Sequence, residues 1–100
     1  MEKGGWVYIM ADRCRGGMYV GVSANLIARV HAHKKGKGSR HVADYNKTRL
    51  VYAERHEEIE PAIVREKLVK KWRREWKLAL IEAENPDWRD LWNEWFATEA

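Results

Sequence analysis

Two side chains suited to phosphate chemistry lie one helical turn apart in the first half of the chain. Arg29 and His33 are four positions apart, so on a helix they emerge from one face and can reach the same anionic group. A guanidinium presents a planar fork that matches phosphate oxygens, and an imidazole titrates near neutral pH and can move a proton. Taken alone, the same spacing is more typical of two solvated helix residues.

A carboxylate further along the chain could bind a hard cation. Glu66 lies on the flank of an apolar helical stripe, which predicts a position at the boundary between core and solvent. Mg²⁺ is typically held by one or two protein carboxylates together with water and substrate phosphate, so one Glu suffices for a site that the substrate completes. The alternative for Glu66 is an ion pair with Lys70, four residues later.

Zinc is a weaker interpretation of the titratable residues. His31 and His33 would point to different sides of a helix, and the chain has one cysteine, Cys14, so no cysteine pair accompanies the histidines. The same count excludes an internal disulfide.

Charge is divided unevenly along the chain. Residues 1–56 carry 11 Lys and Arg against 4 Asp and Glu, whereas residues 57–100 carry 8 against 11. A basic half favours a polyanionic partner, because binding releases counterions from phosphates. The candidate phosphate contacts flank Arg29 and His33 and are Lys34, Lys35, Lys37 and Arg40.

Length and composition predict one folded unit. The chain has 100 residues, of which 45% are hydrophobic and 34% charged. It has no uncharged apolar run long enough to span a membrane and no apolar segment typical of a secretory signal near its start. We therefore expect a cytoplasmic protein with a single domain over residues 1–100, a core from about 4 to 92 and a frayed C-terminus.

In the first half of the chain, the elements that must position these residues are two strands, a helix and a third strand. Residues 6–10 and 18–22 are rich in β-formers and predict a hairpin, which places Tyr8 and Tyr19 on neighbouring strands. Ser23 or Asn25 can cap a helix over residues 25–35, and residues 48–55 are the third candidate strand.

The second half is predicted to be helical. A long helical region after Pro61, with a break near residues 72–75, presents one apolar stripe to the sheet and ends at Asn85 and Pro86. Residues 87–96 predict a short terminal helix. The stripe consists of Ala62, Leu68, Val69, Trp72, Trp76, Ala79 and Leu80. The expected fold is α+β, a small three-stranded antiparallel sheet flanked by helices.

In this order the segments resemble the GIY-YIG nuclease family, including its small single-domain bacterial members, the N-terminal domain of a DNA-repair excinuclease and the homing endonucleases. The matching segments are Trp6-Val7-Tyr8, Tyr19-Val20-Gly21, the helix from Asn25 through Arg29 to His33, the glutamate-bearing helix Ala62 to Lys67, and the tail from Leu80 to Trp88. Trp6 and Val20 replace the usual glycine and isoleucine of the two triplets, and residues 40–45 depart from the family pattern.

The resemblance implies hydrolysis of DNA phosphodiesters with one divalent cation, Mg²⁺ or Mn²⁺. By this resemblance Tyr8 helps to activate or orient water with His33, Arg29 steadies the phosphate, Tyr19 positions it and Glu66 anchors the cation. Asn85 is a weaker match, for which a helix-stopping role beside Pro86 is an equal alternative.

Three functions follow as hypotheses. The first is a metal-dependent endonuclease of low sequence specificity that acts on distorted DNA in repair, recombination or DNA degradation, with RNA as the other possible substrate. The second is a non-catalytic nucleic-acid-binding module of the same fold. The third is a protein-interaction domain, which would require an exposed patch formed by Trp88, Trp92 and Trp95.

Overall fold

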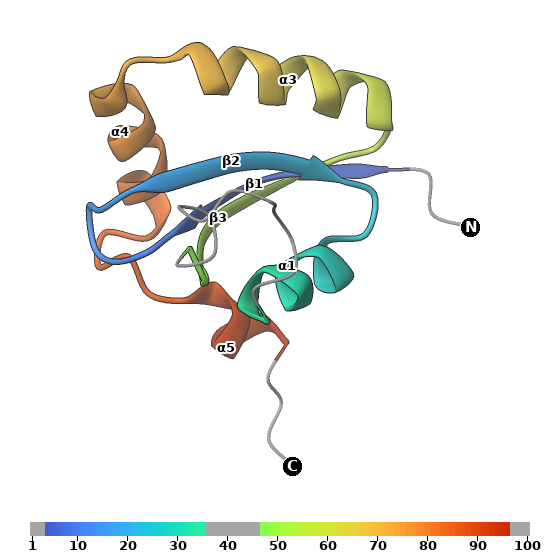
Figure 1. Cartoon of the computed structure of the whole chain (residues 1–100). Coiled ribbons are helices and arrows are strands. Elements are labelled where there is room, and N and C mark those ends of the chain that lie inside the picture. Colours follow the sequence, from blue (N-terminus) through green and yellow to red (C-terminus); the bar gives the residue numbers. More distant parts are fainter. Residues whose placement is uncertain (1–3, 36–46, 97–100) are drawn as a thin grey trace.

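The computed structural model describes residues 4–35 and 47–96, which form an antiparallel sheet with helices on both faces (Figure 1). Strand β1 (Gly5–Ala11) is central, between β2 (Met18–Ser23) and β3 (Arg49–His56). The predicted α+β fold with a three-stranded antiparallel sheet is confirmed. The three strands lie within one or two residues of their predicted bounds.

The hairpin register fixes which side chains share a face. Tyr8 lies opposite Gly21, and Met10 lies opposite Tyr19. Because side chains alternate along a strand, both tyrosines point to the same side of the sheet. The turn between the strands is held by the carboxylate of Asp12, which accepts a hydrogen bond from the Gly17 backbone N–H at 2.9 Å.

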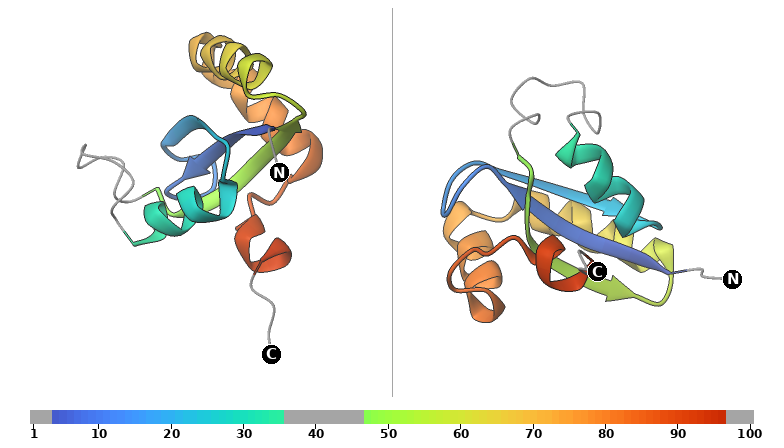
Figure 2. Two further views of the ribbon diagram at one scale, coloured as in Figure 1. Left: turned by 90° about the vertical axis from the view of Figure 1, so that its right-hand side faces the viewer. Right: turned by 90° about the horizontal axis from the view of Figure 1, so that it is seen from below.

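Helices cover the two faces in pairs (Figures 1 and 2). Helices α3 (Ile59–Lys71) and α4 (Arg74–Glu84) pack on one face, and α1 (Leu26–Lys34) and α5 (Leu91–Trp95) pack on the other. The core under α3 and α4 includes Val7, Ile9, Val69, Ile81 and Trp88. The core under α1 and α5 includes Tyr8, Met10, Leu26, Val30, Leu50 and Leu91.

The predicted break in the long helical region is confirmed. Helix α3 ends at Lys71 and α4 begins at Arg74, and both Trp72 and Arg73 have an extended backbone with ψ of 154°. None of the helices that the structure describes combines the length and apolar character needed to cross a membrane.

The prediction of one apolar stripe through both helices is wrong in part. Ala62 and Val69 are buried, whereas Leu68 and Trp76 are 53% and 51% exposed. For Trp76, the helical wheel assumes an unbroken helix, and the two extended residues change the phase of α4 relative to α3. Leu68 lies in α3 before the break, on the exposed side of that helix. The inference that Trp76 belongs to the core therefore fails.

The predicted terminal helix over residues 87–96 is also too long, because α5 begins at Leu91. Trp88 adopts a left-handed backbone with φ of 55°, and its fully buried indole donates a hydrogen bond to Glu82 at 2.6 Å. Asp90 then caps α5 by accepting from the Trp92 backbone N–H. Since Trp88 is buried, it cannot join Trp92 and Trp95 in the exposed patch that a protein-interaction domain would require.

Candidate active site

Three aromatic rings from three elements meet on the α1 face of the sheet. Tyr8 of β1, Tyr19 of β2 and His33 of α1 have ring centroids separated by 6.3 Å (Tyr8 to Tyr19), 5.9 Å (Tyr8 to His33) and 5.0 Å (Tyr19 to His33). The Tyr8 hydroxyl oxygen lies 3.3 Å from Nε2 of His33, within reach of a hydrogen bond. A phenol in contact with an imidazole can pass a proton between them.

The close approach of the tyrosines depends on Gly21. A β-carbon at position 21 would lie 2.5 Å from the Tyr8 hydroxyl oxygen and 2.9 Å from the Tyr19 ring. No side chain fits between those groups, so the strand needs glycine at this point. The resemblance included Gly21 in its motif but assigned it no role, and a glycine inside a strand was the clue to a close contact.

Helix α1 presents His33 to the core and His31 to solvent. Leu26, Val30 and His33 form the buried side of the helix, and Asn25 caps its start by accepting from the Ala28 backbone N–H at 3.1 Å. His31 is exposed, with its ring 6.4 Å from that of Trp92. The two histidines therefore point to different sides, as predicted.

Arg29 lies one turn before His33 on the exposed part of α1. It lines a shallow hollow with Ser23, Asn25, Ala28 and Ala32. Its positive charge lowers the pKa of the Tyr8 phenol, although burial has the larger, opposite effect. Arg29 therefore belongs to the electrostatic environment of the ring cluster while its guanidinium remains open to a ligand.

Glu66 approaches from α3, which packs beside the edge strand β2 (Figure 1). Glu66 is 7% exposed, and its Oε2 forms an ion pair with Nζ of Lys70 at 2.7 Å. The ion pair that was the alternative interpretation of Glu66 is thus present. The hydrogen bond to Glu66 raises the pKa of Lys70, and the Glu66 charge also acts on Tyr8.

The phenol of Tyr8 keeps its proton in this environment. Burial raises its pKa well above the ordinary value, and the neighbouring Tyr19 raises it further. Arg29 lowers the pKa but does not overcome the loss of solvation. The protein alone therefore does not supply Tyr8 as a ready phenolate base.

The Glu66 carboxylate fits a cation site that substrate would complete. Within residues 4–35 and 47–96, no group of three or more His, Cys, Asp or Glu side chains could hold a metal ion by itself. A hard cation such as Mg²⁺ uses few protein ligands and keeps water and phosphate oxygens. The Glu66 carboxylate, whose charge acts on Tyr8 from α3, has the oxygen donors that such an ion requires.

The predicted phosphate contacts have different surroundings. Lys34 donates to the Thr48 carbonyl at 2.8 Å and forms an ion pair with Asp90, so its charge is compensated within the protein. Lys35 is exposed at the end of α1. Lys37 and Arg40 lie outside the described residues.

Asn85 joins the end of α4 to strand β3 and to the backbone of Arg89. Its side-chain amide donates to the carbonyls of Val51 at 3.1 Å and Arg89 at 2.9 Å, and its oxygen accepts from the Arg89 backbone N–H at 3.0 Å. Val51 is the extra residue of a β-bulge opposite Ile9 and Met10. These bonds match the helix-stopping alternative for Asn85.

Comparison with known proteins gives consistent results. Residues 4–79 match the model of the GIY-YIG catalytic domain. UPF0213 proteins from Staphylococcus aureus strains Mu50 and N315 are each 35% identical over 78 residues, which cover 77% of this chain and 93% of those proteins. The solution NMR structure of a UPF0213 protein from Bacillus halodurans has the same fold, with a TM-score of 0.55 and 24% identity over 96% of this chain and 99% of that one. The chain therefore belongs to the GIY-YIG family, as one of its small UPF0213 proteins.

Proposed function

We propose that this protein is a divalent-metal-dependent endonuclease that hydrolyses phosphodiester bonds in DNA. The observation that carries the proposal is the meeting of Tyr8, Tyr19 and His33 in one cluster, with Arg29 and Glu66 acting electrostatically on it. Membership of the GIY-YIG family supports nuclease chemistry. The finer claims, which are DNA as substrate, Mg²⁺ or Mn²⁺ as cofactor and the role of each residue, are those that the resemblance to the family implies, and the chemistry of the cluster supports them.

The hydrogen-bonded pair of Tyr8 and His33 can move the proton of an attacking water. Because Tyr8 keeps its proton, its hydroxyl acts as a relay in which the oxygen accepts a proton from water while the phenolic proton passes to Nε2 of His33. The water oxygen then forms a bond to phosphorus, and the bond from phosphorus to the leaving 3′ oxygen breaks. Tyr19, in contact with both rings, positions the phosphate.

Two groups would stabilise the negative charge that develops on the phosphoryl oxygens. The exposed guanidinium of Arg29 can bind non-bridging oxygens through paired N–H donors. Glu66 would hold the cation, and a bound divalent ion supplies Lewis acidity at the phosphate and at the leaving oxygen. To bind the cation, the Glu66 carboxylate must give up part of its ion pair with Lys70.

The substrate that we propose is branched, nicked or otherwise distorted DNA, cut with low sequence specificity during repair, recombination or degradation of DNA. The groups of the candidate site would contact the phosphate backbone. Because phosphate contacts carry no sequence information directly, we expect low sequence specificity. A distorted backbone can bend, which would let one of its phosphates reach a cluster that is largely buried.

A nicking assay tests this function. Purified protein should convert supercoiled plasmid to the open circle with Mg²⁺ or Mn²⁺, and Glu66→Gln should abolish cutting while DNA binding, measured by a gel shift, is retained. Glu60→Gln is the matched control, because it makes the same change on an exposed residue in the first turn of the same helix. Parental cutting by Glu66→Gln would exclude the metal assignment.

One observation favours the second candidate, a nucleic-acid-binding module without catalysis. The Glu66 carboxylate is already paired with Lys70, as it would be in a purely structural role. Comparing Tyr8→Phe with Lys35→Ala separates the two functions. A nuclease loses rate with the first change and affinity with the second, whereas a binding module is insensitive to the first.

A further inference from the structure

The α3–α4 elbow, residues 67–77, is a basic surface within the acidic half of the chain. Residues 57–100 contain 8 Lys and Arg, and six of them lie in the elbow, against a single acidic residue, Glu75. The six are Lys67, Lys70, Lys71, Arg73, Arg74 and Lys77. This concentration of charge is separate from the basic residues of the first half.

An apolar groove opens in the middle of this charge. Trp72 and Trp76 meet edge to face, with ring centroids 6.2 Å apart and planes at 83°. Together with Ala79 and Leu80 they line a groove of about 350 Å³. Trp76 is 51% exposed, which is a large aromatic surface for solvent to contact.

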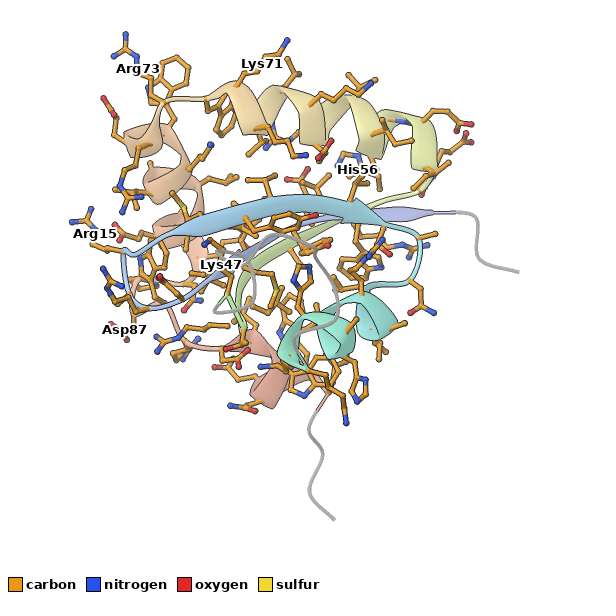
Figure 3. The ribbon with its side chains drawn as sticks, in the orientation of Figure 1. Arg15, Lys47, His56, Lys71, Arg73 and Asp87 are labelled. Atoms are coloured by element: carbon orange, nitrogen blue, oxygen red, sulfur yellow. The ribbon has the colours of Figure 1, made fainter. Side chains whose placement is uncertain are left out.

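Cationic groups lie over and around the indoles. Arg73 lies over the Trp76 ring with its guanidinium carbon 5.4 Å from the centroid, and Arg65 lies in the same way over Trp72 at 5.1 Å. In Figure 3 the side chains of Lys71 and Arg73 extend away from the sheet. The elbow therefore presents flat aromatic surface bordered by positive charge.

We propose that the α3–α4 elbow binds single-stranded nucleic acid, with an unpaired base stacked on Trp76 and phosphates bound by Lys71 and Arg73. Aromatic stacking combined with a positively charged surface is the chemistry of sequence-tolerant single-strand binding. Lys70 and Arg73 form ion pairs with Glu66 and Glu75. An apolar protein partner would use the groove but would leave the charges of the other four basic residues of the elbow uncompensated. Charge complementarity thus selects a polyanion that carries flat apolar groups.

The elbow begins next to Glu66, the candidate cation ligand on α3. Glu66 and Trp72 are six residues apart near the end of α3, which corresponds to about 9 Å along a helix axis. Lys70 lies between them and binds Glu66. The inference rests on the proposed function in one respect: it specifies the substrate as DNA that carries unpaired nucleotides beside the bond to be cut.

Binding without metal tests the elbow separately from cleavage. Fluorescence anisotropy of a short labelled oligothymidylate, in EDTA, is compared for the parent, Trp76→Ala and Trp76→Phe. Stacking of one base predicts that Trp76→Ala weakens binding by roughly tenfold to a hundredfold and that Trp76→Phe retains most of the affinity. Trp95→Ala, a change to another exposed tryptophan, on α5, should leave the affinity unchanged.

The salt dependence tests the phosphate contacts. Arg73→Ala should reduce the slope of log affinity against log salt by roughly 0.7, the contribution of one phosphate contact on a single strand. Arg89→Ala, which removes an exposed arginine paired with Glu94 away from the elbow, should leave the slope unchanged.

Two results would overturn the inference. One is parental affinity for the oligonucleotide in Trp76→Ala. The other is a change of oligomeric state: the parent sediments as a dimer, whereas Trp76→Ala sediments as a monomer and binds the oligonucleotide with unchanged affinity. That result would make the groove a contact between copies of the chain. Absence of cleavage with Mg²⁺ or Mn²⁺ would contradict the proposed function and leave this binding result intact.

Discussion

Gly21 lies directly against the hydroxyl of Tyr8, and a β-carbon at Gly21 would be 2.5 Å from that oxygen. The two residues are partners across the β1–β2 ladder, so the contact is set by strand register. The absence of a β-carbon at Gly21 on β2 thus leaves the space that the Tyr8 hydroxyl of β1 occupies. The position of the Tyr8 hydroxyl, and through it the contact with His33, depends on the absence of a side chain at Gly21.

Gly21→Ala should therefore damage both the site and the fold. The added methyl must displace the Tyr8 hydroxyl end or the Tyr19 ring, and overpacking of this kind costs about 1–3 kcal/mol. Urea denaturation should show that loss, and the nicking rate should fall sharply. Gly17→Ala is the matched control, because its β-carbon would meet nothing closer than 3.4 Å. Equal effects of the two substitutions would contradict the role of Gly21.

Tyr8→Phe should lower the nicking rate by about 10²–10⁴-fold, the usual contribution of a positioned proton-transfer group. The phenyl ring still fills the core, so the free energy of unfolding should change little. Tyr52→Phe provides the control on the opposite face of the sheet, where the hydroxyl donates to Glu54 at 2.6 Å. That variant should lose about 1 kcal/mol of stability and keep its nicking rate. A Tyr8→Phe protein that cuts normally would exclude the relay.

Much of the site could be predicted because its residues lie on short regular elements. The alternating pattern of the hairpin placed Tyr8 and Tyr19 on neighbouring strands. The four-residue spacing predicted a common face for Arg29 and His33, whereas the structure buries His33 and exposes Arg29 one turn earlier. The flank position of Glu66 anticipated a carboxylate at the core boundary. Each of these inferences needs geometry within one or two elements, which local periodicity provides.

The errors arose where backbone conformation changes abruptly. A helical wheel carried through Trp72 and Arg73 assigned Trp76 to the core, although both residues are extended and end the phase of α3. Because the backbone of Trp88 is left-handed, α5 begins at Leu91, later in the chain than predicted. The partner of Lys34 is Asp90, which is 56 residues away, and no local pattern reports such a contact.

Asn85→Ala should reduce stability without a direct effect on chemistry. The change removes three hydrogen bonds of a buried side chain, one to Val51 of β3 and two to the backbone of Arg89, at about 1 kcal/mol each. We expect a loss of roughly 3 kcal/mol in urea denaturation, with a normal nicking rate at temperatures where the variant is folded. Asn93→Ala, an exposed change on α5, should be near neutral. A stable Asn85→Ala protein that does not cut would indicate a catalytic role instead.

The Glu54 network should make stability depend on acid pH. Burial alone would raise the pKa of Glu54, but hydrogen bonds from Tyr52, His56 and Arg65 outweigh burial and lower it. A carboxyl with a lowered pKa in the folded state stabilises the protein above the unfolded-state pKa of ~4.3, and this contribution is lost as pH falls through the folded value.

Urea denaturation at a series of pH values checks this contribution. The parent should lose stability as pH falls below the ordinary carboxyl range, and Glu54→Gln should lose less over the same interval. Arg65→Met, which removes the donor at 2.9 Å, should also flatten the curve. Parallel curves for the parent and Glu54→Gln would show that the network contributes nothing to the acid response.

The most direct test is a crystal structure of the protein with a DNA fragment and Mn²⁺, located by its anomalous scattering. The account predicts one ion bonded to a carboxylate oxygen of Glu66, and a backbone phosphate between that ion and the guanidinium of Arg29, with the Tyr8 hydroxyl facing the phosphorus. An ion bound elsewhere, or DNA whose phosphates avoid both Arg29 and Glu66, would contradict the assignment of these residues to a nuclease active site.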